Sequence, residues 1–585
     1  MGKVCPTRSY YAMRFKIFAF LFLLIPFVHG QSRAQSVLRG DWLGKFDDLT
    51  LVIEMSFDTV SDGHGGHSYI GTWTSPLQAG EIERMGEVSL SGNTLTVSMP
   101  SQGARFSATT GGGATPHLEG TWTQQGKTHK LVMCRARAYV GILPTPRDSI
   151  RLVFKFAPGP KGSTIATFGS PDQTSRIDAT DRVVDSSGTL RFAVPKVGAT
   201  YGGKRSKDQT SIKGNLDFGG KSQPMDLTYE SQPHMLVRPQ EPRGPLSYTE
   251  RDVTFRNDAQ AIELSGTLTI PKGGGAAPAV LLVPSAGPFD RDAAIADHKT
   301  MLVIADYLTR HGFVTLRVDR RGVGQSHGTL ADATVTDLMT DVAAAVRFLR
   351  KTREVDPTKI GLLGHGEGGL IASITTAFDS NLHFLVLLSA PGERCDQVYN
   401  GQIEESFRLA GFNENALRTQ MKLYVDIDSI LSHSARLDEG DAPVVQYLTH
   451  VRDSLIKLEP AGSKKIEGIK ADFVKLQSLL LSPWHKSYVR INPALVFRTV
   501  RCPVLAVGGS LDKQIPAKDN IAAIETALHG AKNMQVETKI YPGLNHLLQD
   551  AKTGEPREYQ RINESISPQV LADVNAWMVA HTKGK

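Results

Sequence analysis

Three segments of the sequence follow predicted strands and together carry the elements of a catalytic site. Residues 364–369 form a glycine-rich turn between a short apolar run and a helical pattern. Residues 508–516 contain Asp512, and residues 541–546 end in His546. Because ligands of parallel sheets bind at the carboxyl ends of the strands, we expect the three segments to meet. Asp512 would then hold one nitrogen of His546 and leave the other as a base.

The first segment has a glycine, Gly366, at its centre and allows two interpretations. Gly364, Gly366 and Gly369 fit the dinucleotide pattern Gly-x-Gly-x-x-Gly, which also follows a strand and opens a helix. That pattern needs an acidic residue at the end of the next strand. The next apolar run, residues 384–388, ends instead in Ser-Ala-Pro. We therefore interpret the segment as a turn that would normally present a nucleophile, and not as a cofactor loop.

The region from residue 246 to residue 585 alternates apolar runs with helical patterns. Continuous apolar runs are typical of a parallel sheet that helices cover on both faces. Residues 393–498 interrupt the alternation with helix-prone sequence, which predicts a lid inserted between two strands. The predicted strands are residues 280–283, 314–318, 360–363, 384–388, 504–507 and 536–540, and the predicted helices include residues 301–311 and 335–351.

The region in front of this domain contains an internal repeat. Matching motifs recur with offsets of 94 to 97 residues, for example Gly44 with Gly141 and Pro100 with Pro195. Each copy is a series of short alternating strands separated by turn residues, which predicts two small all-β modules, residues 38–136 and 137–230. Residues 231–245 are rich in proline and are interpreted as a linker.

From about residue 246 onward, the chain resembles the secreted α/β-hydrolase esterases whose turn reads Gly-His-Ser-Glu-Gly-Gly. The residues that carry the resemblance are the turn itself and three supporting segments, residues 285–292, 317–324 and 482–484. The two β modules resemble the N-terminal extensions of that group. The resemblance implies an α/β-hydrolase fold with a helical lid, and hydrolysis of a small-molecule carboxylic ester, with peptide-like substrates also possible.

The resemblance also implies a role for individual residues. Asp512 would be the acid and His546 the base of a triad, in the chain order that this fold uses. The backbone N–H groups of Glu367 and of Ala286 would form the oxyanion hole. Trp484 and His365 are expected to contact the substrate. No metal ligands, cofactor or nucleic-acid footprint is predicted.

Gly366 departs from the family pattern, since a glycine offers no hydroxyl for acyl transfer. Glycine adopts the strained turn without cost, so the fold is expected to survive the change. In a well-studied serine protease, loss of the serine costs roughly 10⁶ in turnover. Two hypotheses follow. The protein is an enzyme of reduced or altered activity that uses Asp512 and His546, or it is a pseudoenzyme that binds an ester, peptide or glycan-like ligand.

Four other residues near strand ends carry nucleophilic or basic groups: Ser285, His365, Cys395 and Ser510. A replacement nucleophile must meet the base and the oxyanion donors together. The sequence gives no sign that any of the four does so, and packing or loop hydrogen bonding is predicted for each of them.

The N-terminus and the composition indicate where the protein works. Residues 1–30 contain a basic start and a run of about a dozen apolar residues, too short to span a bilayer, so we expect a cleaved signal peptide. The prediction is a secreted or periplasmic protein.

The charge and the remaining composition are ordinary for a globular protein. The formal charge of +7 includes four positive groups of the N-terminal segment. The cysteines of the mature chain are few and far apart, and the histidines of residues 62–67 are interpreted as a hairpin tip.

Overall fold

The computed structural model describes residues 38–46, 51–61, 67–76, 83–111, 116–144, 149–173, 177–186, 188–231, 238–242, 246–460, 463 and 465–582. The predicted signal segment, residues 1–30, and most of the histidine-containing segment, residues 62–66, lie outside these ranges. The chain divides into two compact units. Residues 1–140, 154–168 and 177–232 form the first unit, and residues 141–153, 169–176 and 233–585 form the second.

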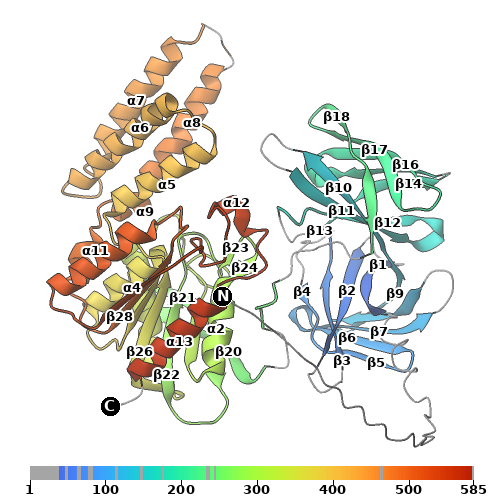
Figure 1. Ribbon diagram of the computed structural model, residues 1–585, viewed down its shortest axis with the longest axis horizontal. Coiled ribbons are helices and arrows are strands. Elements are labelled where there is room, and N and C mark those ends of the chain that lie inside the picture. The colour runs from blue at the N-terminus through green and yellow to red at the C-terminus, as the bar shows by residue number, and fades with distance from the viewer. Residues whose placement is uncertain are drawn as a thin grey trace, which may run out of the picture. The chain divides into compact units, whose positions relative to one another are not determined.

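The predicted all-β region is present as two sheets of short strands (Figure 1). In the described residues, the first sheet has the strand order β4-β3-β2-β1-β9-β8-β7-β6-β5, and the second sheet has the order β13-β12-β11-β10-β19-β17-β16-β15-β14, with β18 paired to β17. The strands of the first sheet are β1 (Gly40–Phe46), β2 (Val52–Ser61), β3 (His67–Thr74), β4 (Glu83–Arg84), β5 (Val88–Ser91), β6 (Thr94–Met99), β7 (Ala104–Gly111), β8 (His117–Gln124) and β9 (Lys127–Arg135). Those of the second sheet are β10 (Arg137–Pro144), β11 (Ser149–Pro158), β12 (Thr164–Gly169), β13 (Ile177–Ala179), β14 (Asp181–Ser186), β15 (Thr189–Val194), β16 (Ala199–Arg205), β17 (Ser211–Phe218), β18 (Lys221–Pro224) and β19 (Leu227–Glu230).

Several strands of both sheets bury one face, as alternating sequence requires. In β6 the side chains of Leu95, Val97 and Met99 are buried, while the residues between them are partly exposed. The core of the second sheet is aromatic. There the ring of Phe192 lies 4.9 Å from that of Phe154 and 5.3 Å from that of Tyr201.

A buried ion cluster, formed by Lys155, Glu54 and Asp41, joins the two sheets. Lys155 lies on β11 of the second sheet, and its Nζ contacts Glu54 Oε1 at 2.5 Å and Asp41 Oδ2 at 2.9 Å on the first sheet. Thr167 donates to the second oxygen of Glu54 at 2.7 Å. Burial alone would lower the pKa of Lys155, but the two carboxylates outweigh it and raise that pKa. The lysine is therefore charged across the physiological range.

The second unit is built on a sheet of mostly parallel strands. Its order is β20-β21-β25-β22-β26-β27-β28-β29, and only the pairs β20–β21 and β21–β25 are antiparallel. The strands are β20 (Tyr248–Asn257), β21 (Ile262–Pro271), β22 (Ala277–Val283), β25 (Val314–Val318), β26 (Val355–His365), β27 (Leu385–Leu388), β28 (Val504–Gly509) and β29 (Val536–Tyr541). A separate hairpin pairs β23 (Ala294–Ile295) with β24 (His298–Lys299). The sequence analysis did not predict the long β20–β21 hairpin.

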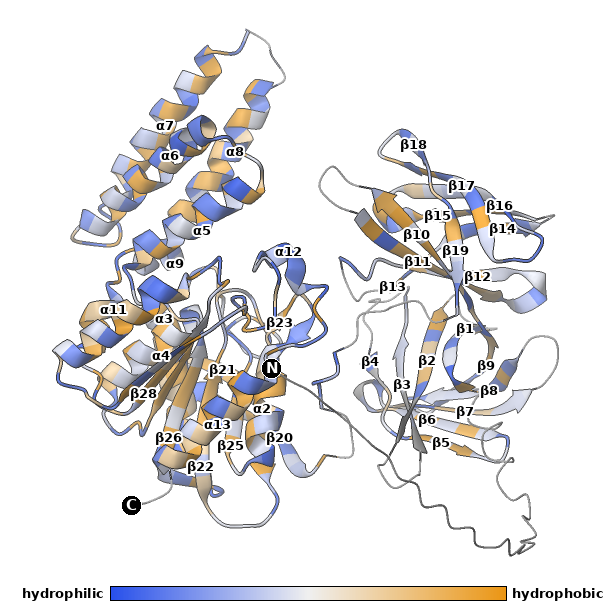
Figure 2. Ribbon diagram, in the orientation of Figure 1, coloured by the Kyte–Doolittle hydropathy of each residue, from blue (hydrophilic) through white to orange (hydrophobic). Residues whose placement is uncertain are grey.

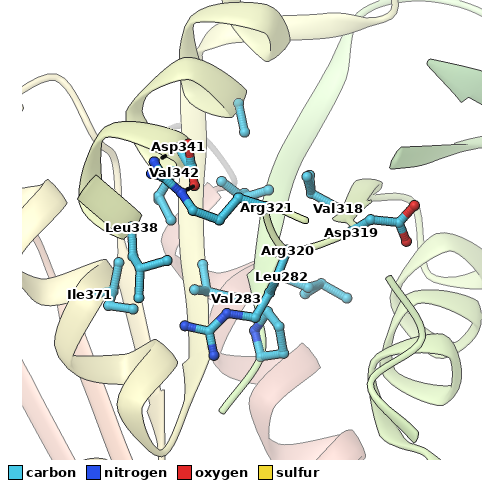
Figure 3. Close-up of a pocket in the computed structure, with 13 residues that line it drawn as sticks. Leu282, Val283, Val318, Asp319, Arg320, Arg321, Leu338, Asp341, Val342 and Ile371 are labelled. Carbon is cyan, nitrogen blue, oxygen red and sulfur yellow. Dashed lines mark hydrogen bonds and ion pairs between the residues drawn. The ribbon is translucent and has the colours of Figure 1, made fainter. Parts of the chain in front are cut away.

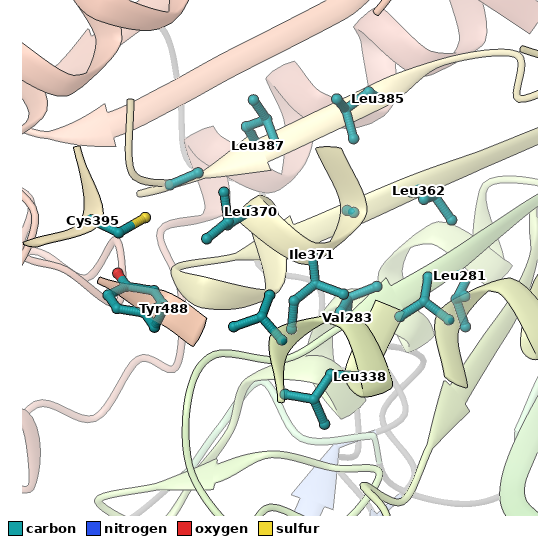
Figure 4. Packing of buried hydrophobic residues seen from close by; sticks show 14 of the residues in the cluster. Leu281, Val283, Leu338, Leu362, Leu370, Ile371, Leu385, Leu387, Cys395 and Tyr488 are labelled. Carbon is teal, nitrogen blue, oxygen red and sulfur yellow. The ribbon is translucent and has the colours of Figure 1, made fainter. Parts of the chain in front are cut away.

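Helices cover both faces of this sheet (Figure 1). One face carries α2 (Thr300–Arg310) and α13 (Pro568–Thr582), and the other carries α3 (Val335–Arg350), α4 (Glu367–Phe378) and α11 (Ala517–Gly530). The apolar run of β22 serves both faces, because Val280 and Leu282 pack with α2 while Leu281 and Val283 pack with α3 and α4. Figure 2 shows the apolar character of these strands, and Figure 4 shows Leu281, Val283 and Ile371 packed together.

A helical insertion separates β27 from β28. It comprises α5 (Cys395–Leu409), α6 (Glu414–His433), α7 (Asp441–Lys457), α8 (Lys465–Leu480), α9 (Pro483–Tyr488) and α10 (Pro493–Phe497). Figure 1 shows α5 to α8 as a group of helices at one end of the sheet. The short helix α9 is capped by Ser482, whose hydroxyl accepts from the N–H of His485.

Part of the predicted linker packs firmly on the second unit. Arg238 donates to the backbone carbonyls of Asp297, Ala296, Gln560 and Ile562.

No helix among the described residues is long and apolar enough to cross a membrane. The short helix α12 (Pro556–Tyr559) completes this part of the surface.

Candidate active site

Gly366 stands at a sharp turn between β26 and α4. Its backbone angles, φ 55° and ψ −124°, lie in a region that side-chain-bearing residues adopt only with strain. Its N–H donates to the carbonyl of Leu388 at 2.9 Å, which ties the turn to the end of β27. The geometry is that of a turn built to present a side chain, although this residue has none.

A second glycine brings the start of α4 against the end of β22. A Cβ at Gly368 would collide with the carbonyl oxygens of Val283 and Pro284. Only glycine therefore permits this approach. The consequence is that the loop after β22, which contains Ser285, lies beside the turn at Gly366.

Asp512 and His546 form a buried hydrogen-bonded pair at the ends of β28 and β29. His546 Nδ1 lies 2.9 Å from Asp512 Oδ2, so the carboxylate accepts the Nδ1 proton. The other oxygen, Oδ1, accepts from the N–H groups of Gln514 and Ile515, both at 2.8 Å. With its carboxylate held on both oxygens, Asp512 fixes the tautomer that leaves Nε2 of His546 free to take a proton.

The free nitrogen of His546 points at the position that a side chain of residue 366 would take. An ideal Cβ built on Gly366 would lie 3.5 Å from His546 Nε2. A serine hydroxyl at that position would therefore be within hydrogen-bonding reach of the base. The structure thus brings together the three segments that the sequence analysis singled out.

His365, predicted as a substrate contact, lies instead behind His546. It is 3% exposed, and its Nε2–H donates to the backbone carbonyl of His546 at 2.9 Å. Burial, together with the neighbouring His546, lowers the pKa of His365 to about 4. A neutral, buried ring in this place positions the base and does not touch substrate.

An ionic network supports the predicted oxyanion donors. Arg320 donates through Nη1 to the carbonyls of Ser285 and Gly287, at 3.0 and 3.1 Å, and through Nη2 to Glu367 Oε2 at 3.0 Å. The other oxygen of Glu367 accepts from Trp484 Nε1. Trp484, the second predicted substrate contact, is therefore anchored to the start of α4.

The same network orients the two backbone N–H groups. In a trans peptide the C=O and the N–H point in opposite directions. Because the carbonyl of Ser285 faces Arg320, the N–H of Ala286 points to the other side of the loop. The N–H of Glu367 belongs to the first turn of α4, where no intrahelical carbonyl can accept it. Both groups are available to an oxyanion.

Three of the four alternative groups have structural roles. His365 supports His546, as described above. Cys395 is fully buried against Tyr488 (Figure 4), and burial raises the pKa of its thiol, so it is not a nucleophile. Ser510 accepts from the N–H of Gly543 at 2.9 Å. Ser285 is the exception, because its hydroxyl lies in the nucleophile position itself.

The sequence analysis gave no role to Arg320, which lies within a segment that it quoted only for resemblance. The sequence feature that could have identified Arg320 was a run of charged residues, Asp319 to Arg321, directly after a strand.

Arg320 and Arg321 also line a small cavity. Figure 3 shows the two side chains pointing apart, with Arg321 paired to Asp341. The cavity that they line holds about 50 Å³, against several hundred Å³ for a substrate pocket, so it is not the substrate site.

Comparison with known protein families matches part of the second unit. The family described as "Serine aminopeptidase, S33" matches residues 297–440, which include α2, α3, β26 and α4. The second unit has the α/β-hydrolase fold. The match covers the nucleophile turn and ends before the segments of Asp512 and His546.

Several individual proteins are similar to this chain. Esterase EstD of Thermotoga maritima is 24% identical over 338 residues, covering 57% of this chain and 68% of that protein. A 31.7 kDa protein of Escherichia coli, described as uncharacterized, is 24% identical over 241 residues, covering 40% of this chain and 74% of its own length. Among solved structures, an esterase of Pyrococcus furiosus is 16% identical with a TM-score of 0.36, covering 60% of this chain and 99% of its own.

Proposed function

We propose that this protein is an exported hydrolase of small carboxylic esters, in which His546, held by Asp512, acts as the general base. The observation that carries the proposal is the 3.5 Å between His546 Nε2 and the Cβ position of residue 366, with Asp512 on the opposite nitrogen. A pair left over by chance would have no reason to keep this alignment. The similarity to an esterase over 57% of the chain supports the ester as the substrate class.

The reaction needs four things from the chain. His546 Nε2 removes a proton from the attacking hydroxyl, which in the simplest form of the proposal is water. The N–H groups of Glu367 and Ala286 stabilise the negative oxygen of the tetrahedral intermediate. His546 then returns its proton to the leaving alcohol. Asp512 stabilises the imidazolium that forms between these two steps.

The second candidate function is binding without turnover. Gly366 favours it, because the residue that would normally attack the ester is absent. In this version, the cleft holds an ester, peptide or glycan-like ligand and the pair of Asp512 and His546 is a remnant. The intact hydrogen bonds of Asp512 favour retained chemistry.

The remaining parts of the chain fit an exported hydrolase. In this proposal, residues 1–30 are a cleaved signal peptide and residues 38–136 and 137–230 are two copies of one β module. The same strand order in both sheets supports the duplication. The helical insertion acts as a lid, supported by the contact of Trp484 with Glu367.

Three proteins separate the two functions. Short acyl esters are assayed with the unmodified chain, with His546→Ala and with Gly366→Ser. Turnover by the unmodified chain that disappears in His546→Ala supports the proposed base. Turnover only in Gly366→Ser supports the binding protein, with a site complete except for its nucleophile. No turnover in any of the three would sink the proposal that an esterase site survives.

A further inference from the structure

The space that the missing side chain of residue 366 leaves is occupied by another hydroxyl. A Cβ built on Gly366 would overlap Ser285 Oγ and would lie 3.3 Å from Ser285 Cβ. The oxygen is closer to this point than the carbon, so the hydroxyl of Ser285 is directed into the nucleophile position. A side chain at residue 366 and the present position of Ser285 Oγ exclude each other.

The hydroxyl of Ser285 lies near the base. Its Oγ and His546 Nε2 flank the same point, the Cβ position of residue 366, with Nε2 at 3.5 Å from it. Within the described part of the chain this hydroxyl forms no hydrogen bond, either to His546 or to another group, and Ser285 is part-exposed. A nucleophile needs these properties together, a neighbouring base and access to the substrate.

The backbone around Ser285 is held in place. Arg320 donates to the carbonyls of Ser285 and Gly287, and the approach of Gly368 fixes the strand end from which the loop leaves. The N–H that follows Ser285 in sequence is that of Ala286, and the N–H from the facing element is that of Glu367. A nucleophile turn uses the same two kinds of donor, one from the next residue and one from the opposite loop.

We propose that Ser285 is the catalytic nucleophile of this protein, supplied by the loop after β22 in place of the turn after β26. The inference rests on the proposed esterase function. His546 Nε2 takes the proton of Ser285 Oγ, and Oγ bonds to the ester carbonyl carbon while the carbonyl π electrons move to its oxygen. The intermediate collapses, the carbon–alkoxide bond breaks, and the alcohol leaves with the proton from His546.

The resulting acyl-Ser285 ester is then hydrolysed. His546 removes a proton from water, whose oxygen bonds to the acyl carbon. The bond to Ser285 Oγ breaks, and Oγ recovers a proton from His546. The net reaction is ester plus water to acid plus alcohol, so no further co-reactant is needed.

A fluorophosphonate probe tests the assignment on the full chain. The probe forms a stable adduct with an activated serine, and peptide mapping by mass spectrometry locates it. We expect a single adduct on Ser285 of the unmodified protein. We expect none on Ser285→Ala, and labelling at least about 100-fold slower in His546→Ala, since the loss of a general base costs about that much or more. The control Ser432→Ala, which changes a partly exposed serine of α6, should label like the original.

Turnover of a nitrophenyl acetate distinguishes failure of this inference from failure of the proposed function. We expect Ser285→Ala to lose at least about 100-fold in kcat, and Ser285→Cys to form a trapped acetyl thioester. If Ser285→Ala keeps the original kcat while His546→Ala is inactive, water is the nucleophile and the inference is wrong, although the esterase stands. If neither the original protein nor any variant hydrolyses the ester, the inference and the proposed esterase function are both wrong.

A paired substitution keeps the test valid even if Ser285→Ala folds poorly. Gly366→Ser should clash with Ser285 Oγ, whereas Gly366→Ser combined with Ser285→Gly relieves the clash and restores a nucleophile at the turn. We expect the double variant to be more active than either single one, a non-additive result that neighbouring residues produce. If the effects of the two substitutions on activity are additive, the side chains of residues 366 and 285 do not compete for the same position, and the inference is wrong.

Discussion

Among its described residues, the second unit contains two buried histidine–aspartate pairs, and only one of them lies beside the turn at Gly366. His546 and Asp512 lie at strand ends, with Nδ1 2.9 Å from the carboxylate. His485 and Asp428 lie in the helical insertion, on α9 and α6, with Nε2 2.8 Å from the carboxylate. The two distances are nearly equal and all four side chains are buried. The hydrogen bond alone therefore does not make a catalytic pair.

The difference lies at the second nitrogen of each ring. The free nitrogen of His546 faces Ser285 and the turn at Gly366. That of His485 is buried and has no hydrogen-bond partner among the described residues, and the ring of Tyr399 lies 4.6 Å away. An imidazole without access to substrate or nucleophile cannot move a proton in a reaction. The pair in the insertion stabilises the structure, and the pair at the strand ends can do chemistry.

The largest expected effect is on the strand-end pair. Asp512→Asn should lower kcat for short esters by about 10³–10⁴-fold, because the amide no longer stabilises the correct tautomer and charge of His546. The measurement is kcat at saturating ester, with Asp472→Asn, an exposed change on α8, as the control. A loss of kcat smaller than about tenfold would mean that the strand-end pair contributes no more to catalysis than the insertion pair.

The insertion pair should show the opposite pattern. Asp428→Ala leaves His485 and Asn400 without their shared carboxylate, so the free energy of unfolding should fall by about 3–5 kcal/mol. The kcat of the molecules that remain folded should stay within about threefold, which corresponds to less than 1 kcal/mol.

Asp426→Ala is the matched control for this change. Asp426 lies two residues away on α6 but is partly exposed, and its carboxylate pairs with Lys422 and Tyr447. Its loss should cost about 1 kcal/mol or less. Denaturant unfolding measures both variants, and equal losses would show that burial of the pair does not matter.

Part of the pH dependence of stability should come from the support behind the strand-end pair. Burial lowers the pKa of His365, which supports His546, from its ordinary value of 6.5 to about 4. The unfolded chain therefore binds more protons between these values, and stability is lost as pH falls from about 6.5 to about 4. The contribution is on the order of 3 kcal/mol. This loss of stability should be absent when the unfolding free energy of His365→Gln is measured against pH. It should remain in His311→Gln, which changes an exposed histidine.

The smallest effect tests whether the two regions communicate. Trp484, next to His485, donates to Glu367 at the catalytic turn and stacks on Tyr488 at 5.1 Å. Trp484→Phe keeps the stacking and removes the hydrogen bond, worth about 1 kcal/mol. We expect kcat/KM to fall by about fivefold, with little change in stability. An unchanged kcat/KM would mean that the insertion does not help to position Glu367.

The sequence predicted those parts of the molecule that depend on local pattern. Most of the parallel strands were predictable because continuous apolar runs must be covered on both faces, and Asp512 because it follows such a run. His546 was predictable because it follows a predicted strand in the expected chain order. The β20–β21 hairpin was missed, since its strands are largely polar and lie beside a proline-rich segment. The pair of Asp428 and His485 is separated by 57 residues on two helices, so no spacing reveals it. The direction of Ser285 depends on how closely α4 approaches β22, which is a property of packing.

The buried ion cluster of the first unit has a consequence for dissection of the protein. Lys155 comes from the second sheet, whereas Glu54 and Asp41 come from the first. A fragment that ends at residue 136 would expose two carboxylates selected for a buried cation, and a fragment that starts at residue 137 would leave that cation inside a core without counter-charge. Neither sheet is therefore expected to fold stably when it is separated from the other. The smallest part of this region that can be expressed, transplanted or lost in one piece is the pair of sheets together.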